Sequence, residues 1–244
     1  MPCTVEKYFE KCSQVMNDYC KLLEYYKACF GLVDCFHFNS ETARNVYLEN
    51  LGTVNGKVVP ITHSGIIDNR QKKLFDSNAL RIGFIGNATP YKGLPLLMKV
   101  LKQTPDKVLW RLNVWGGKVG KERDWPIFYM GKFDSRSIAS VYDGMDVLVV
   151  PSIWKETFGF VVLEALSYGV PVIVSDNVGA KDIVGQYDER FIFTSEAELS
   201  VLLDKIVNDR SLLADFNENI LNGEWKYSMQ SHTEEILRLY ETII

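Results

Sequence analysis

The chain has 244 residues, a formal net charge of −4 and an isoelectric point near 5.5, so it lacks the basic balance of a nucleic-acid-binding protein. Its 47% hydrophobic and 24% charged residues are ordinary for a globular protein. The first residues lack the basic-then-apolar layout of a signal peptide, and no apolar run approaches the roughly 20 residues that span a bilayer.

The cysteines lie within the first 35 residues of the chain. Their number is odd and no C-x-x-C pair occurs, so we expect reduced thiols rather than a disulfide framework or a zinc site. Three scattered histidines, which we interpret as structural or surface residues, are His37, His63 and His232.

The N-terminal part is predicted to contain helix, strand, helix and strand. Residues 4–30 carry apolar side chains at helical spacing, and the charges between them favour a packed surface helix over a membrane or partner face. A strand is expected at 33–38 and another at 57–61. Between them, Ser40 is the expected N-cap of a helix that Leu51 and Gly52 close. The polar residues 65–78 indicate a linker.

The remainder alternates strands with helices, which predicts a doubly wound parallel sheet. The expected strands are 81–86, 108–114, 127–130, 147–150, 171–176 and 191–193. The expected helices are 94–103, one capped by Asp134 or Ser135, one beginning at Phe160, 195–207, 211–221 and 227–242. Residues 118–125 are expected to be a charged loop. Ligands of such folds bind beyond the carboxyl ends of the strands, where Lys92, Gly131, Glu156 and Gly159 fall.

Residues 151–176 are the most informative stretch, because they predict strand end, Gly-centred turn, apolar helix and strand in succession. Gly159 lets backbone approach a ligand closely, and the unpaired N–H groups of the following helix form an anion site. Glu164 lies one turn into this helix, where a carboxylate needs hydrogen-bond donors such as vicinal sugar hydroxyls. The alternative is that Glu164 is a surface residue stabilised by the helix dipole.

Lys92 also lies near a predicted helix N-terminus. A cation is unfavourable there unless an anion is bound nearby, so Lys92 is a candidate phosphate ligand. The alternative is a solvated loop lysine.

The 151–173 stretch closely resembles the E-x7-E region of retaining GT-B glycosyltransferases, family four in the usual classification. The resemblance rests on PS at 151–152, ETFGFVVLEA at 156–165 and GVPVI at 169–173. It implies that Glu164 holds the ribose of a nucleotide-sugar donor and that Glu156 lies by the donor sugar. It also implies that the N–H groups of Phe160 and Val161, after Phe158 and Gly159, face the diphosphate.

A second resemblance concerns residues 86–93, where the family has G-R-x-x-x-x-K-G. Lys92 fits the lysine, but Asn87 stands where the arginine is expected, so one of two diphosphate-binding cations is missing. The turn at His63 and Ser64 departs similarly, because the family has Pro-Asn there. In the family the loop after the third strand holds the base, which implies that Gly131, Lys132 and Phe133 lie near it. Apolar packing is an equal explanation for Phe133.

The resemblance implies the C-terminal half of a GT-B fold with a short N-terminal α/β remnant. We therefore expect residues 1–76 to form that remnant and the linker, 77–224 a Rossmann-like donor-binding domain, and 225–244 a C-terminal crossover helix. Family catalysis occurs between two domains, so this chain could bind a donor while lacking the acceptor half.

The leading hypothesis is a retaining glycosyltransferase, or its donor-binding portion, that acts in polysaccharide biosynthesis. A nucleotide sugar, with UDP favoured on family frequency, would donate to a glycan or lipid-linked acceptor. Glu156 and Lys92 are the expected catalytic residues. No cofactor or metal is expected, because no D-x-D triplet or His cluster occurs. The expected location is the cytoplasm, with peripheral association at the inner face of the membrane.

The alternative is a non-catalytic nucleotide-sugar-binding subunit or remnant that needs a separate partner chain for the acceptor half. A glycosidase is not proposed, because Glu164 is assigned to the ribose. A phosphorylase is weaker, since no cofactor-attachment lysine is evident. A dehydrogenase is disfavoured, because no G-x-G-x-x-G follows a strand.

Overall fold

The structure is a computed structural model that describes residues 5–104, 106, 108–134 and 136–243. Its main body is a seven-stranded sheet with strand order β5-β6-β4-β3-β7-β8-β9. All neighbouring strands in it run parallel except β5 and β6. The strands are β3 (Leu80–Ile85), β4 (Trp110–Trp115), β5 (Val119–Lys121), β6 (Ile127–Gly131), β7 (Val147–Val150), β8 (Val172–Ser175) and β9 (Ile192–Phe193).

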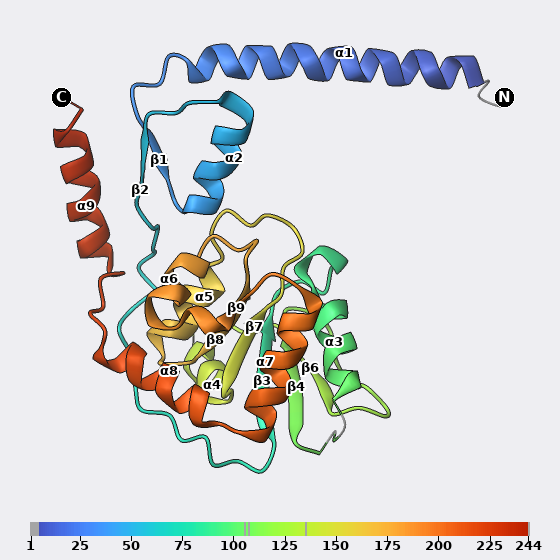
Figure 1. Ribbon diagram of the computed structural model, residues 1–244, viewed down its shortest axis with the longest axis vertical. Helices are drawn as coiled ribbons and strands as arrows, with labels where there is room; N and C mark the ends of the chain where they lie inside the picture. The colour runs from blue at the N-terminus through green and yellow to red at the C-terminus, as the bar shows by residue number, and fades with distance from the viewer. Residues whose placement is uncertain (1–4, 105, 107, 135, 244) are drawn as a thin grey trace.

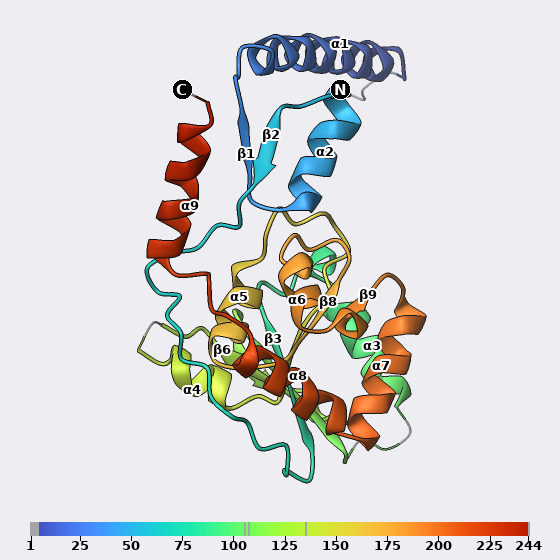
Figure 2. The same cartoon turned by 60° about the vertical axis from the view of Figure 1, so that its left-hand side comes forward.

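Helices cover both faces of this sheet, as Figures 1 and 2 show. The expected α/β fold with a doubly wound parallel sheet is therefore confirmed. The helices are α3 (Leu94–Gln103), α4 (Ile138–Asp143), α5 (Phe160–Ser167), α6 (Lys181–Tyr187), α7 (Glu196–Asn208) and α8 (Ser211–Asn222), with 3-10 turns η1 (Pro90–Lys92) and η2 (Glu189–Phe191).

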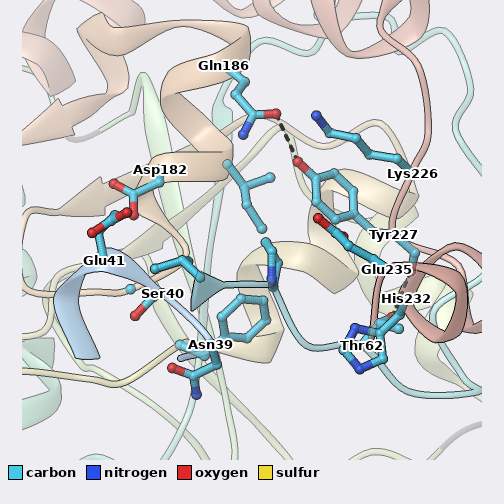
Figure 3. A pocket seen from close by; sticks show the side chains of 15 residues that line it. Asn39, Ser40, Glu41, Thr62, Asp182, Gln186, Lys226, Tyr227, His232 and Glu235 are labelled. Atoms are coloured by element: carbon cyan, nitrogen blue, oxygen red, sulfur yellow. Dashed lines mark hydrogen bonds between the residues drawn. The ribbon is translucent and has the colours of Figure 1, made fainter. Parts of the chain in front are cut away.

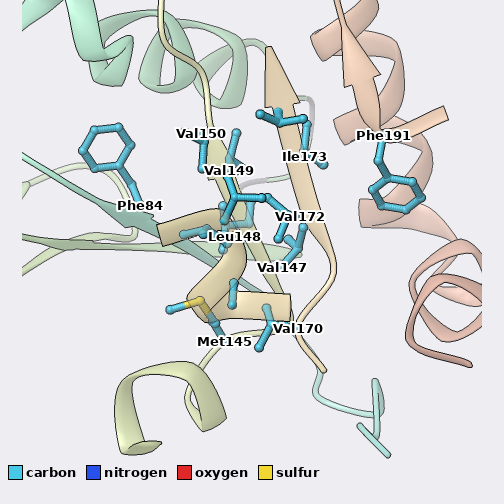
Figure 4. Close-up of a cluster of buried hydrophobic side chains, with 14 of the residues drawn as sticks. Phe84, Met145, Val147, Leu148, Val149, Val150, Val170, Val172, Ile173 and Phe191 are labelled. Atoms are coloured by element: carbon cyan, nitrogen blue, oxygen red, sulfur yellow. The ribbon is translucent and has the colours of Figure 1, made fainter. Parts of the chain in front are cut away.

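The core is centred on the middle strands, where every residue of β7 and β8 is buried (Figure 4). These strands consist of Val, Leu, Ile and one Ser, the near-continuous apolar pattern of a sheet covered on both faces. Residues such as Trp110, Phe191 and Phe216 fill the layers between sheet and helices.

The N-terminal part forms a separate two-stranded parallel sheet from β1 (Phe36–Phe38) and β2 (Gly56–Val58), connected by α2 (Glu41–Leu51). Ser40 caps α2 by accepting a hydrogen bond from the N–H of Ala43, as expected. The chain's last helix, α9 (Met229–Glu241), lies beside this sheet (Figure 1). Lys57 Nζ donates to Thr242 Oγ1 at 3.4 Å.

Helix α1 (Val5–Phe30) projects away from the rest of the chain (Figures 1 and 2). The expected helix is present, but the packed stripe is wrong for the side chains that the structure describes, because Tyr19, Leu22 and Tyr26 are exposed. Among the α1 side chains that the structure describes, Phe30 at the end of the helix packs, through contacts with Phe36 and Tyr47. The stripe residues Tyr8, Cys12 and Val15 lie outside the described side chains.

Several element boundaries differ from the expectation. The charged loop at 118–125 contains β5, which pairs antiparallel with β6 at the sheet edge. The Asp134 carboxylate accepts from the N–H groups of Arg136 and Ser137, as an N-cap does, but these bonds close the turn before α4, which begins only after Ser137. Ser135 lies outside the described residues. Helix α6 was not predicted, since its seven residues carry no clear apolar period.

The final helix begins at Met229 rather than at Tyr227. Ser228 accepts from the N–H of Ser231 and so caps the helix. Tyr227 is instead buried, and its carbonyl accepts a hydrogen bond from Thr62. Packing of an aromatic ring thus holds the residue in the extended segment before α9.

Candidate active site

A pocket of about 370 Å³ lies where β3, β4 and β7 end and α5 begins. In the strand order, β4 lies on one side of β3 and β7 on the other, so the chain winds in opposite directions from this point. Such switch points are the usual ligand sites of doubly wound sheets. Six predicted site residues line the pocket: Asn87, Lys92, Glu156, Gly159, Phe160 and Val161.

The N-terminus of α5 forms one wall of this pocket. Gly159 precedes the helix with φ +101, a left-handed conformation that an L side chain rarely adopts, and a Cβ there would lie 2.8 Å from Val178 Cγ1. The N–H of Val162 bonds to the carbonyl of Gly159 at 3.0 Å. The preceding N–H groups, those of Phe160 and Val161, are at the free end of the helix and are oriented for an anion.

Lys92 and Glu156 form an ion pair inside the pocket, with Lys92 Nζ 2.9 Å from Glu156 Oε1. The Lys92 and Glu156 side chains are 32% and 11% exposed, so Glu156 is the more enclosed partner. Buried Ser152 donates its hydroxyl proton to the same Glu156 oxygen. An anion was expected beside Lys92, and in this structure the carboxylate of Glu156 takes that place. Sequence reasoning did not include Ser152, although it lies in the PS motif.

The backbone of Glu156 is held by the loop after β8. Its N–H donates to the carbonyl of Asn177, and its carbonyl accepts from the N–H of Gly179, both at 2.9 Å. These two bonds hold the Glu156 backbone at the pocket wall, and the contacts with Lys92 and Ser152 orient its carboxylate.

Glu164 lies one helical turn beyond Phe160 and does not line the pocket itself. Its Oε2 accepts a hydrogen bond from Tyr142 Oη at 2.7 Å, and its Oε1 lies 3.5 Å from His63 Nε2. The side chain is 18% exposed, which does not fit a surface residue. The donors expected for Glu164 are thus present in the protein. Sequence reasoning missed both, since Tyr142 lies on α4 and His63 in the turn before the linker.

Tyr142 is fully buried, and burial followed by the charge of Glu164 raises the pKa of its hydroxyl well above the ordinary value. It therefore remains a hydrogen-bond donor throughout the physiological range. His63 accepts from the N–H of Gly65 through Nδ1, which places its remaining N–H on Nε2, toward Glu164. Its ring also packs edge-on against Phe160. His63, in the turn before the linker, thus contacts two residues of α5, and it stands at the position where the sequence departs from the family pattern.

The residues predicted near the base lie beside the pocket rather than in its lining. The carbonyl of Gly131 accepts from the N–H of Gly116 at 2.8 Å, and Gly116 is a lining residue. Lys132 is exposed, whereas Phe133 is half-buried and packs against the core. Phe133 thus packs against the core, as the apolar-packing interpretation expects.

Phe158 is buried, with 3% of its surface exposed, and its ring packs edge-on against Phe160. It lines a second pocket, of about 290 Å³, between the start of α2, α6 and the chain around α9 (Figure 3). Ser40 Oγ donates to the carbonyl of Thr157 at 2.5 Å on this side. The loop 157–159 thus separates the two pockets.

The part of the chain that the structure describes contains no group of three or more His, Cys, Asp or Glu placed to hold a metal ion. Within the same residues, none of the helices has the length and apolar character needed to cross a bilayer. The described cysteines Cys20, Cys29 and Cys35 are unpaired thiols.

Comparison with known families gives a match between residues 66–222 and the family described as "Glycosyl transferases group 1". The chain belongs to this family. The matched segment runs from the start of the linker to the end of α8 and so contains the whole pocket at the switch point.

Curated relatives include the N,N'-diacetylbacillosaminyl-diphospho-undecaprenol alpha-1,3-N-acetylgalactosaminyltransferase of Campylobacter jejuni. It is 26% identical over 243 residues, which cover 90% of this chain and 63% of the relative. An uncharacterized glycosyltransferase of Methanocaldococcus jannaschii is 24% identical over 177 residues, covering 65% of this chain and 44% of the relative. The chain thus spans less than two thirds of these proteins.

Similar solved structures include Anabaena HepE in complex with UDP and glucose, with a TM-score of 0.69 and 18% identity over 90% of this chain and 66% of that one. Sucrose-phosphate synthase from Thermosynechococcus elongatus has a TM-score of 0.66 and 20% identity over 91% of this chain and 61% of that one. These similarities show the fold, which is the Rossmann-like C-terminal half of a GT-B glycosyltransferase.

Proposed function

We propose that this chain is a retaining glycosyltransferase of family four, or its donor-binding portion, that uses a nucleotide sugar. The observation that carries the proposal is the convergence of Lys92, Glu156 and the N-terminus of α5 in one pocket at the switch point. A cation and free backbone N–H groups suit a diphosphate, and the carboxylate suits sugar hydroxyls.

In this proposal the diphosphate lies between Lys92 Nζ and the N–H groups of Phe160 and Val161. As the bond between sugar C1 and the diphosphate oxygen breaks, negative charge grows on the diphosphate, and these groups stabilise it. The acceptor hydroxyl forms the new bond to C1, and its proton passes to the departing diphosphate. Glu156 positions the sugar, and Glu164 the ribose.

The base is assigned to the loop of Gly131, Lys132 and Phe133, next to Gly116 at the pocket wall. Asn87 faces the pocket where the family pattern has an arginine, so Lys92 is the cation that the proposal relies on. UDP is the proposed nucleotide, and the similar HepE structure, a complex with UDP and glucose, supports this choice. No metal or other cofactor takes part in this proposal.

A glycan or a lipid-linked glycan is the proposed acceptor, in polysaccharide biosynthesis at the cytoplasmic face of a membrane. The name of the Campylobacter relative, which describes a diphospho-undecaprenol acceptor, supports this class. The proposed division of the chain is an N-terminal portion with linker at 1–76, a donor-binding domain at 77–224 and the final helix segment at 225–244.

A second candidate is a non-catalytic nucleotide-sugar-binding subunit whose acceptor half comes from a partner chain. The specific observation in its favour is Asn87, which lines the pocket where the family pattern has a second cation. Catalysis between two domains would then need a second surface opposite the pocket.

Calorimetric titration of the chain with UDP, GDP and a panel of nucleotide sugars tests the donor site. Binding that Glu164→Ala weakens would support it, and the preferred nucleotide would identify the base. Absence of binding to the whole panel would contradict the proposal for this chain. Detecting sugar transfer or hydrolysis of the bound donor then separates the enzyme from the binding subunit.

A further inference from the structure

An exposed aromatic pair lies at the edge of the donor pocket. The rings of Tyr91 and Trp154 have centroids 5.1 Å apart and planes inclined by 38°, so they form a shallow angled surface. Tyr91 is 45% exposed, Trp154 55% and the neighbouring Ile153 56%. We call Tyr91, Ile153 and Trp154 the aromatic platform. Contiguous exposed apolar surface of this kind often marks a ligand site.

The platform is held in place by backbone contacts rather than by its own rings. The N–H of Ile153 donates to the carbonyl of Tyr91 at 2.9 Å, which ties the η1 turn to the loop after β7. Gly93 has φ +78 and packs on Pro151 so closely that a Cβ would overlap the Pro151 carbonyl oxygen. Two segments that are about 60 residues apart in the chain are thus locked together, and their aromatic side chains still point outward.

The platform is continuous with the proposed catalytic groups. Tyr91 directly precedes Lys92, and Trp154 lies two residues from both Ser152 and Glu156. Consecutive Cα atoms are about 3.8 Å apart, so the Trp154 backbone is at most about 7.6 Å from those of Ser152 and Glu156. A ring bound at this surface would therefore lie next to the place proposed for the donor sugar.

We propose that the aromatic platform binds a pyranose ring of the acceptor. This inference rests on the proposed function. Aromatic faces carry negative potential and attract the weakly positive C–H groups on the apolar face of a sugar, while the hydroxyls at the sugar's rim remain in water. A membrane surface is the less favoured occupant, because the platform adjoins a polar, charged pocket with a carboxylate at 11% exposure.

The test uses the full chain with UDP and three probes, the methyl α-pyranosides of glucose, galactose and mannose. Binding is followed by the indole N–H resonance of Trp154, assigned through Trp154→Phe. At least one pyranoside should shift this resonance, and Tyr91→Ala should weaken its affinity about tenfold. The affinity of Tyr91→Ala for UDP, measured by calorimetry, should stay within twofold of the wild-type value. Tyr240→Ala, which removes an exposed ring on α9, is the matched control and should change neither affinity.

The outcomes separate the two proposals. UDP binding with no pyranoside response at Trp154 would overturn the platform and leave the donor site intact. A pyranoside response in a chain that does not bind UDP would support a carbohydrate-binding platform and contradict the donor site. A Trp154 response to vesicles of phosphatidylglycerol and phosphatidylcholine, without one to the pyranosides, would overturn the sugar assignment in favour of a membrane surface.

Discussion

Lys92 Nζ lies 2.9 Å from Glu156 Oε1, so the cation and the carboxylate that we assign to a donor's diphosphate and sugar neutralise each other before any donor is bound. A diphosphate that binds Lys92 must compete with this carboxylate. The pair is partly open to solvent, and pairs of this kind contribute about 0.2–1 kcal/mol.

Replacing Glu156 by Gln should therefore tighten UDP binding by up to about fivefold, because Lys92 no longer has an anionic partner. The same change should lower sugar transfer, since the carboxylate is lost from the sugar site. Calorimetry with UDP and a transfer assay measure the two effects. Glu218→Gln, an exposed residue of α8, is the control. Unchanged UDP affinity in Glu156→Gln would mean that Lys92 does not reach the diphosphate.

Glu164 and Lys92 should give different patterns across a nucleotide series. A ribose ligand contributes equally to uridine and UDP, so Glu164→Ala should weaken both by a similar factor, about tenfold for a lost charged hydrogen bond. Lys92→Met should weaken the binding of UDP by a similar factor and leave the binding of uridine nearly unchanged. Titrations of uridine and UDP against both variants check this. Equal losses of uridine and UDP in Lys92→Met would make Lys92 a structural residue.

Six candidate residues could be selected from the sequence and lie in one pocket, because the motifs that contain them are local. Residues 156–165 contain the Gly turn, the helix start and both glutamates within ten positions, and Lys92 was placed by its position after a strand. Likewise Ser40, Ser195 and Gly52 are helix caps whose residue types signal their role directly. The parallel order of the sheet followed from strands and helices alternating along the chain.

The partners of the site residues could not be predicted, because they come from distant segments. Tyr142 is 22 positions from Glu164, and His63 is about a hundred positions from it, so no spacing rule connects them. The ion pair of Lys92 with Glu156 likewise joins two segments that are far apart in the chain, so sequence spacing could not predict it. Strand β5 was missed because Val119 is the single apolar residue in three exposed positions at a sheet edge.

Tyr142→Phe tests whether Glu164 needs its buried donor. Removing the hydroxyl leaves one carboxylate oxygen with a lost charge-assisted bond, so the free energy of unfolding should fall by about 1–3 kcal/mol. Urea denaturation measures this loss. Tyr240→Phe removes an exposed hydroxyl and should have little effect. If both variants were equally stable, the contact between Tyr142 and Glu164 would not stabilise the fold.

Asn87→Arg restores the cation that the family pattern has at this position. Asn87 lines the pocket with Lys92, so an added guanidinium should tighten UDP binding and steepen its dependence on salt concentration. Uridine binding should be unaffected. Asn87→Gln, of similar polarity without the charge, is the control. No gain in UDP affinity would mean that this loop holds residue 87 away from the diphosphate.

Lys73 should make stability depend on pH. Its Nζ donates to the carbonyls of Tyr142 and Met145, at 2.6 and 3.4 Å, at the end of α4. Burial lowers the pKa of Lys73 to about 8, against an opposing effect of the Asp143 carboxylate. Below pH 8 the folded protein thus carries a partly desolvated charge, which costs at most about 3 kcal/mol. Between pH 8 and 10.5 the unfolded chain binds more protons, so the free energy of unfolding should rise with pH from this residue.

The measurement is urea denaturation across this pH range for the wild type, Lys73→Met and Lys72→Met. Other groups titrate in the same range, including the tyrosines of the unfolded chain, but they are common to all three proteins and cancel in the differences. Lys72 is exposed, so Lys72→Met should behave like the wild type. For both proteins the free energy of unfolding should rise, relative to that of Lys73→Met, as the pH increases above 8. The absolute stability of Lys73→Met also reflects its lost hydrogen bonds, so the slope with pH is the deciding quantity. Parallel curves for all three proteins would show that Lys73 keeps an ordinary pKa in the folded state.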